Sequence, residues 1–427
     1  MTLTRWLIVA LAAAALAHGI RSVAASEDPT GAAVAITQPG NADETSRLIA
    51  VFEARLEEDQ TYPDLATLGG LYLTRARTSG LLDDHVTALD IWERAAALAP
   101  DSPDALVGLA QAEISVHRFI AAADHAAKAL ESDPTNAGAT IVVVDAALAN
   151  GDSAQAASGL DRLSAVAGDD PAVLVRRAQL EWLTGDPESA LLLAESADRG
   201  SSNLGLDPST AAVFTAHRAG LLNDTGRYAD VLELIPDDSG HPPLAFQRAR
   251  ALMGVGDLDS AVEALETLVL ERPDPQFLAQ LGRLLLATGD TRKLGGVDAT
   301  IEALQALDES GVYARPLATW MVDRGLDPAV ALELAERDDR DDPGGHDARA
   351  WALYANGRHE EARTEADAAL ASGVTDPLIA YHSGEIWMAL GELDEARADF
   401  EQALDWSPGF DALHVARTHE LLRRIQG

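Results

Sequence analysis

The residues best suited to metal or acid–base chemistry are few and scattered. His359-Glu360 and His419-Glu420 each begin the histidine–glutamate string of zinc proteases, but neither gains a second histidine at the required spacing. His117 and His125 flank a predicted turn and helix, and an isolated pair of this kind is more often solvated or packed than bound to a metal. We therefore predict no metal site.

The acidic stretch DDRDDPGG, residues 338–345, has some features of a calcium-binding loop. Such a loop needs oxygen ligands at alternating positions and a closing glutamate. Here Pro343 occupies a ligand position and the glutamate is missing. We interpret the stretch as an acidic turn that caps a helix beginning at Pro343, because proline is well tolerated at the first helical position.

Other catalytic and cofactor motifs are absent from the sequence. Neither Lys128 nor Lys293 follows a glycine, so there is no phosphate-binding P-loop, and no G-x-S-x-G nucleophile elbow occurs. The chain has no cysteine, which excludes disulfides, thiolate zinc sites and iron–sulfur clusters. We expect a non-catalytic protein without a cofactor. An enzyme built on the irregular segment 291–318 remains an alternative.

The composition limits the class of partner. The formal net charge is −37 over 427 residues, and 47% of the residues are hydrophobic. Such a chain has ample apolar material to fold, and it is too long for one ordinary core. Its acidic surface repels phosphate groups, so we expect no binding to nucleic acid and none to anionic lipid surfaces.

The N-terminus has the layout of a secretory signal peptide. Arg5 precedes the apolar run Trp6–Ala17, and the small residues 23–25 stand before Ser26. We predict cleavage after Ala25, a flexible leader over residues 26–42, and export to the periplasm or the cell exterior. The alternative is an uncleaved N-terminal anchor, which would make the protein a membrane-attached envelope-assembly factor facing outside the cytoplasm.

A periodic pattern of small residues follows the leader. Ala396, Phe400, Ala403 and Pro408 are spaced by four, three and five residues, and a similar set stands 34 residues earlier. The related sets are Ala362/Ala366/Ala369, Ala261/Leu265/Leu268, Ala190/Ala194/Ala197, Ala122/Ala126/Ala129 and Ala88/Trp92/Ala95. Twelve positions before these sets, a preceding helix carries its own small residue, at Ala110, Ala178, Ala249, Ala350 and Gly384.

Turn and cap residues recur in phase with this pattern. Glycine, which reaches the left-handed conformation without strain, marks the turn between paired helices. These positions are Gly151, Gly185, Gly226, Gly256, Gly289, Gly325, Gly357 and Gly391. Several first helices open on a capping residue followed by proline, namely Ser102-Pro103, Asp170-Pro171, Asp342-Pro343 and Asp376-Pro377.

The sequence therefore resembles the tetratricopeptide repeat family over roughly residues 60–410, with the period of about 34 residues and the Ala-x₃-Phe…Pro pattern of that family. The resemblance implies an all-α superhelical solenoid of about nine or ten antiparallel helix pairs within residues 43–427, in which each repeat contacts only its neighbours. We expect flanking helices at 43–58 and 411–426, the latter a solvated cap with arginine and histidine outward. Irregularities are expected at an added loop (199–210) and at 291–318, where Gly295-Gly296 would break a helix and Pro316 falls inside the next.

In that family, the first helix of each repeat lines the inner, concave surface. Transferred by register, this surface carries two mostly apolar columns beside a mostly polar one, which suits a bound peptide segment or helix of a partner protein. The partner-binding residues implied in this way are Gln111, Asp145, Gln179, Trp182, Phe246, Arg250, Arg283, Trp351, Tyr354 and Tyr381. These columns hold no lysine, and asparagine only at Asn223, so a clamp for chaperone C-termini is disfavoured.

Overall fold

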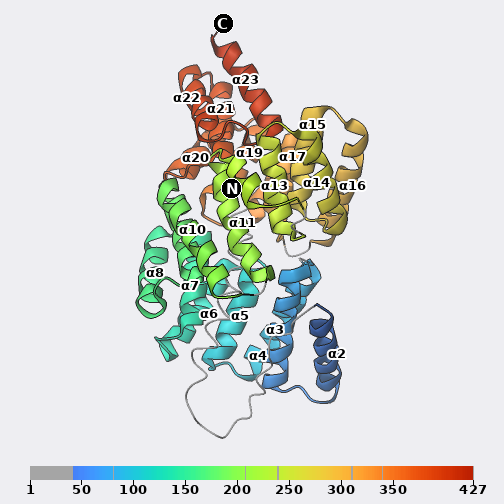
Figure 1. Ribbon diagram of the computed structural model, residues 1–427, viewed down its shortest axis with the longest axis vertical. Helices are drawn as coiled ribbons and strands as arrows, with labels where there is room; N and C mark the ends of the chain where they lie inside the picture. The colour runs from blue at the N-terminus through green and yellow to red at the C-terminus, as the bar shows by residue number, and fades with distance from the viewer. Residues whose placement is uncertain are drawn as a thin grey trace. The chain divides into compact units, whose positions relative to one another are not determined.

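The computed structural model describes residues 42–79, 81–206, 208–237, 240–308, 311–338 and 340–426. Within these ranges all regular secondary structure is helical, in 22 helices labelled α2 to α23, with no strand (Figure 1). This confirms the predicted all-α solenoid of helix pairs. The predicted signal peptide, and all of the leader except its last residue, lie outside the described residues.

The chain divides into two compact units, each of which is described by itself. The N-terminal unit comprises residues 42–148 and 154–176, and the C-terminal unit comprises 149–153 and 177–426. The first contains α2 (Ala42–Glu58), α3 (Tyr62–Ser79), α4 (Leu82–Leu98), α5 (Pro103–Ser115), α6 (Phe119–Ser132), nearly all of α7 (Ala137–Ala149) and α8 (Ser153–Ala167), and the start of α9 (Pro171–Leu183).

The C-terminal unit continues the helix pairs from the second half of α9. It contains α10 (Pro187–Asn203), α11 (Pro208–Asp224), α12 (Tyr228–Leu234), α13 (Pro242–Gly254), α14 (Leu258–Glu271), α15 (Pro275–Thr288), α16 (Thr291–Leu307), α17 (Ala314–Arg324), α18 (Pro328–Arg337), α19 (Pro343–Ala355), α20 (His359–Leu370), α21 (Pro377–Leu390), α22 (Leu393–Trp406) and α23 (Ala412–Gln426). No helix among the described residues combines the length and apolar character that a membrane span requires.

The predicted caps and turns form as expected. Ser102, Asp342 and Asp376 each accept a hydrogen bond from a backbone N–H of the helix that follows, as does Asp170. The eight predicted turn glycines all have positive φ, between 68° and 88°. Local sequence therefore decides where each helix begins and ends.

Close packing between paired helices explains the small residues. Ala396, Phe400 and Ala403 of α22 are fully buried against α21. A Cβ added at Gly384 of α21 would lie 2.6 Å from the Phe400 ring, so the backbone of α21 must approach this ring without a side chain in between. The glycine and the aromatic residue thus fit each other across one helix pair.

Two predicted irregularities were wrong. Helix α16 runs unbroken through Gly295 and Gly296, because Asp290 caps it and an apolar face holding Leu294 and Val297 is buried. Two exposed glycines cost about 1 kcal/mol each, which this burial offsets. The added loop is also shorter than predicted, since α10 continues to Asn203. Pro316 does fall inside the next helix, at the third residue of α17, where helix N–H groups still lack intrahelical partners.

The last helix is not a solvated cap. Helix α23 packs against α15, α21 and α22 in the C-terminal unit (Figure 1), and its His414 is only 2% exposed. A second long-range contact joins Tyr228 and Ser407, whose hydroxyl oxygens lie 2.6 Å apart. The prediction that each repeat contacts only its neighbours therefore fails within this unit, where segments far apart in the sequence meet.

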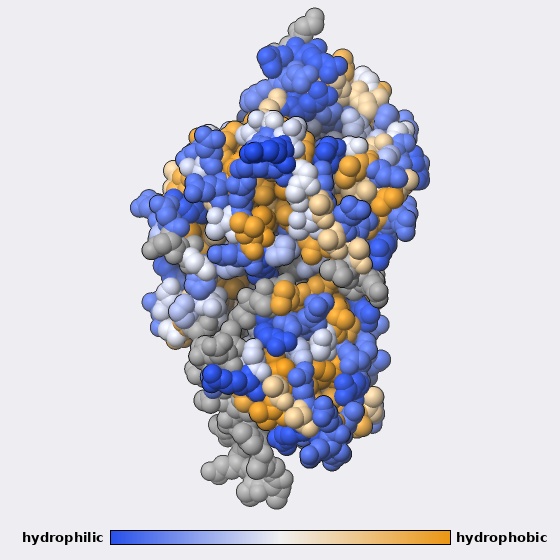
Figure 2. All heavy atoms as spheres, turned by 90° about the vertical axis from the view of Figure 1, so that its right-hand side faces the viewer, coloured by the Kyte–Doolittle hydropathy of each residue, from blue (hydrophilic) through white to orange (hydrophobic). Residues whose placement is uncertain are grey.

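The outer surface is largely polar. Figure 2 shows hydrophilic residues over much of one face, with apolar residues in separate groups between them. Individual large apolar side chains, such as Leu270 (85% exposed) and Leu192 (66% exposed), are also exposed. Isolated exposed apolar residues are normal in folded proteins and do not indicate a site.

Candidate functional site: a buried Asp–His–Arg network

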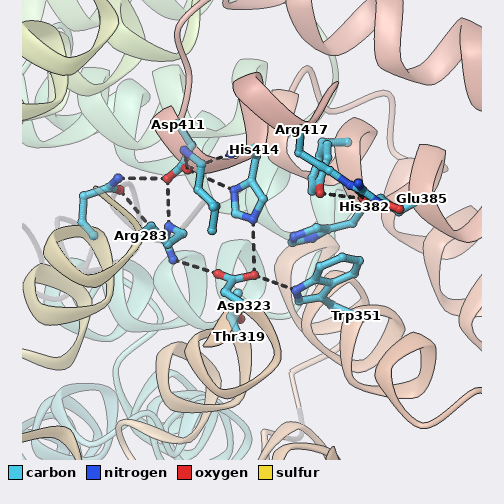
Figure 3. A network of polar contacts seen from close by, with 12 residues as sticks. Arg283, Thr319, Asp323, Trp351, His382, Glu385, Asp411, His414 and Arg417 are labelled. Carbon is cyan, nitrogen blue, oxygen red and sulfur yellow. Dashed lines mark hydrogen bonds and ion pairs between the residues drawn. The ribbon is translucent and has the colours of Figure 1, made fainter. Parts of the chain in front are cut away.

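Four of the ten predicted partner-binding residues meet in one buried network of the C-terminal unit. Arg283 of α15 and Trp351 of α19 lie in this network (Figure 3). Tyr354 of α19 and Tyr381 of α21 join it through hydrogen bonds to Glu385. Arg283, Trp351 and Tyr381 are buried, and Tyr354 is half-buried. The side chains that contact these four residues all belong to this protein.

The other six predicted residues lie in separate places. Asp145 of α7 accepts two hydrogen bonds from Arg176 in the N-terminal unit, at 2.6 and 2.9 Å, and both side chains are fully buried. Gln111 of α5 is half-buried. Gln179 and Trp182 are each 1% exposed, and the Trp182 ring belongs to an apolar core cluster.

The last two of these residues lie on α13. The Phe246 ring packs against Phe277 with a centroid distance of 4.7 Å. Arg250 is half-buried and donates to Asp224 at 2.6 Å. The ten residues therefore do not form one exposed column, and their role in binding a partner stays a prediction.

An alternating square of charges forms the centre of the network. Arg283 donates from Nε to Asp411 at 2.8 Å and from Nη1 to Asp323 at 3.3 Å. His414 lies between the same two carboxylates, with Nε2 3.3 Å from Asp323 Oδ1 and Nδ1 3.2 Å from Asp411 Oδ1. Asp323 of α17 and Asp411, which precedes α23, thus share two basic groups.

The start of α23 positions two members of this square. Asp411 precedes the helix and accepts hydrogen bonds from the backbone N–H groups of Leu413 and His414. This local cap fixes the aspartate and the histidine three residues apart on one side of the first turn. The side chain of Asp411 therefore both starts the helix and pairs with Arg283 of α15.

The electrostatics of the square follow from burial and opposite charge. Burial alone would lower the pKa of His414, but Asp411 and Asp323 outweigh it and raise that pKa to about 9. Burial would raise the pKa of Asp323, but His414 and Arg283 outweigh it and hold that pKa below its usual value. Without another cation, the square contains two anions and two cations near neutral pH.

His382 adds a second imidazole with one unused nitrogen. Its Nδ1 lies 2.8 Å from Asp347 Oδ1, and its ring stacks on Trp351 with a centroid distance of 4.1 Å. The Nε2 atom has no hydrogen-bond partner, although the side chain is only 1% exposed. Trp351 in turn donates from Nε1 to Asp323 at 2.9 Å, which links this part to the square.

A tyrosine–glutamate–arginine group borders the network. Tyr381 and Tyr354 donate to the two oxygens of Glu385, at 2.9 and 3.3 Å, and Arg417 of α23 donates to it at 3.1 Å. Burial, together with the nearby Glu385 charge, raises the pKa of Tyr354 to about 12. Tyr354 therefore links α19 to Glu385 of α21 as a neutral donor, Arg417 links α23 to the same carboxylate, and Tyr381 donates to it from within α21.

The chemistry available to this arrangement is limited. Among the described residues, Asp323, His382 and His414 form the one group of three or more acidic or imidazole side chains close enough to hold a metal ion, with ligand atoms within 4.8 Å of one another. The acidic stretch 338–345 serves a different purpose. Arg315 binds Asp338 and Asp342, and Asp342 caps α19, which agrees with our interpretation of a capping turn.

Sequence reasoning missed the four residues that make this network dense: Asp323, His382, Asp411 and His414. His382 directly follows the predicted Tyr381, and Asp411 and His414 have the i, i+3 spacing of a helix cap with a facing side chain. That spacing is a usable signal, but a last helix that is expected to be solvated gives no reason to look for buried partners of these residues.

The comparisons with known proteins agree with this fold. The family model for the tetratricopeptide repeat matches residues 144–203, 246–291 and 348–409. No curated protein matches the chain. A solved tetratricopeptide repeat protein from Parabacteroides merdae is 16% identical with a TM-score of 0.35, over 61% of this chain and 100% of that one.

Two eukaryotic structures are similar at the same level. Yeast Tom70 is 12% identical with a TM-score of 0.33, over 90% of this chain and 92% of that one. A human IFIT1 dimer with m7Gppp-AAAA is 13% identical with a TM-score of 0.39, over 85% of this chain and 76% of that one. Scores this low carry no argument about function.

The repeat pattern, the helix pairs and the family match together define the class. Three regions of the chain match the tetratricopeptide repeat, and its helices form a repeat scaffold of the kind that binds other proteins.

Proposed function

We propose that this protein is an exported, non-catalytic scaffold that holds a peptide segment or helix of a partner protein on the first helices of its repeats. The observation that supports this most is the tetratricopeptide match over three separate regions. Repeats of this type stack into extended surfaces suited to a partner segment. Nothing in the buried network supplies a nucleophile with its base, which favours binding over catalysis.

Burial divides the predicted residues into two roles. Gln111, Arg250 and Tyr354 keep part of their surface accessible and are the residues we expect to contact a partner. The fully buried ones, such as Trp182 and Phe246, shape the first helices from beneath. Truncating them would therefore damage the fold before it reports on binding.

The charge of the chain indicates the chemistry of the partner. With a net charge of −37, the protein attracts a basic segment and repels an acidic one. Arg250, although basic, is already paired with Asp224 at 2.6 Å. We therefore expect a basic or neutral protein segment with apolar side chains, and no nucleic acid.

Site-specific photo-crosslinking in the source organism tests this proposal. A photoreactive amino acid at Gln111, Arg250 or Tyr354 should crosslink one discrete protein. The matched control is Leu270 on α14, which is 85% exposed and outside the first helices. A crosslink of equal strength at Leu270, or none at any of the three positions, would contradict binding on the first helices.

Export is tested separately on the same cells. We expect the mature chain to begin at Ser26 and to leave the cytoplasm with the soluble exported fraction. Mass spectrometry of the N-terminus measures this directly. An intact Met1 in the membrane fraction would instead support the anchored envelope-assembly factor.

A further inference from the structure

We propose that Asp323, His382 and His414 form a binding site for a divalent first-row transition metal ion such as Zn²⁺, which ties α17, α21 and α23 together. The three ligand atoms lie within 4.8 Å of one another, and each comes from a different helix. The proposal is independent of partner binding, and the role of the ion would be structural.

The unused nitrogen of His382 is the first reason. A buried imidazole nitrogen without a hydrogen bond is costly, and here the side chain is 1% exposed with Nε2 unpartnered. His382 belongs to the group of three potential ligands that also includes His414 and the Asp323 carboxylate. A metal ion would give it the partner that the protein alone does not provide.

The second reason is the orientation of both imidazoles. A histidine that binds a metal through one nitrogen usually has its other nitrogen facing a carboxylate or carbonyl. Here His382 Nδ1 lies 2.8 Å from Asp347, and His414 Nδ1 lies 3.2 Å from Asp411. His414 Nε2 then faces Asp323 at 3.3 Å, and the Nε2 of His382 is left unpartnered in the same group of ligands. Trp351 and Arg283 hold the Asp323 carboxylate in place.

The charges give a third reason. The carboxylates Asp323, Asp347 and Asp411 contribute three negative charges, and Arg283 contributes one positive charge. Glu385 has its own partner in Arg417, 3.1 Å away. A divalent cation supplies the two remaining positive charges.

The donor set selects the class of metal. Two imidazole nitrogens and one carboxylate oxygen suit zinc and its first-row neighbours, whereas calcium and magnesium prefer oxygen ligands alone. The side chains of all three ligands are at most 3% exposed, so the ion would be shielded from substrates. Three protein ligands leave a fourth position open, as in catalytic zinc sites, but burial keeps substrates away from it, so we expect the ion to stabilise the fold.

Titration of the untagged full-length chain with Zn²⁺ or Co²⁺, in a large excess of Mg²⁺ to saturate surface carboxylates, tests the site. We expect one tight equivalent per chain. His382→Phe keeps a ring to stack on Trp351 and removes the ligand, so affinity should fall by more than about 100-fold. Asp347→Asn should weaken binding by roughly 10- to 100-fold through its effect on His382.

His419→Phe is the matched control, because His419 is an exposed histidine on the same helix as His414. It should bind the ion as the wild type does. Equal loss in His419→Phe and His382→Phe, or no tight equivalent at all, would refute the proposal. If His382→Phe loses its helical circular dichroism, the test rests on whether the wild type binds one tight equivalent of the ion. An anomalous-scattering peak about 2.0–2.1 Å from His382 Nε2 supports the site, and a peak elsewhere overturns it.

Discussion

Gly384 of α21 lies where the packed structure has no room for a methyl group. An added Cβ would lie 2.6 Å from two atoms of the Phe400 ring, closer than real Cβ contacts come. Phe400 is fully buried, so its ring cannot swing aside into solvent. Gly384→Ala should therefore destabilise the C-terminal unit, although alanine is the better helix former.

The magnitude follows from two opposing terms. Alanine in place of glycine inside a helix gains about 1 kcal/mol, and overpacking a core costs about 1–3 kcal/mol. Because the obstructing atoms belong to a rigid, fully buried ring, we take the upper part of that range. The expected net loss is about 2 kcal/mol in the free energy of unfolding.

Gly296→Ala is the control that isolates the steric effect. Gly296 also lies inside a helix of the C-terminal unit, but it is exposed and nothing lies within 4 Å of an added Cβ. This variant should gain about 1 kcal/mol. Both variants replace a helical glycine by alanine, so they share the change in helix propensity and the effect on the unfolded chain. The difference between their free energies of unfolding, about 3 kcal/mol, therefore measures the steric clash alone.

Urea unfolding followed by far-UV circular dichroism compares the two variants, since both residues report on the same unit. A second test combines Gly384→Ala with Phe400→Leu, which removes the ring. The double variant should be more stable, by roughly 1 kcal/mol or more, than the summed losses in unfolding free energy of the two single variants predict. A Gly384→Ala variant as stable as Gly296→Ala would refute the reasoning.

Two further predictions concern buried charge. Burial of His217 on α11 lowers its pKa to about 4 from an ordinary 6.5, so the unfolded chain takes up a proton that the folded chain does not. About 3 kcal/mol of stability, present above pH 6.5, should be lost as the pH falls toward 4. Urea unfolding over this pH range should show a smaller loss in His217→Leu than in the wild type. Asp145→Asn leaves Arg176 buried with its ion pair broken and should cost about 3–5 kcal/mol, whereas Asp145→Leu with Arg176→Met should be close to neutral by the same measurement.

Much of the fold could be predicted from the sequence because its signals are local. A capping residue before proline and a glycine at each turn act within a few residues of their own position, and all eight turn glycines adopt positive φ. The pattern of small residues depends on one neighbouring helix, as Gly384 and Phe400 show. Such signals remain readable without knowing the rest of the chain.

The failures concern contacts between distant segments. Nothing near Arg283 in the sequence shows that Asp411, 128 positions later, will pair with it. The same holds for Tyr228 and Ser407, which are 179 positions apart. Helix α16 fails for a related reason, since the buried face around Leu294 outweighs the two glycines that local propensity penalises.

The predicted inner columns illustrate why a site is harder to predict than a fold. Aromatic and charged residues on the first helices suit a bound partner, but they suit equally well a contact between distant helices of the same chain. Trp351, Tyr381 and Arg283 are buried by such contacts in this structure. Residue type alone does not distinguish a residue that binds a partner from one that packs against a distant helix of the same chain. The register of the repeat does not distinguish them either, because it is the same in both cases.

Directional polar contacts also have a role that alanine cannot fill. Paired helices in this chain meet largely through alanine, and one alanine surface fits another in several registers. Hydrogen bonds from Arg283 to Asp411 and from Trp351 to Asp323 fix distances and angles as well as proximity. Buried polar groups can specify one arrangement even when they add little net stability. We infer that the network chiefly fixes how α23 docks on α15, so that its residues select the register between distant helices while the alanine pattern sets the packing within each pair.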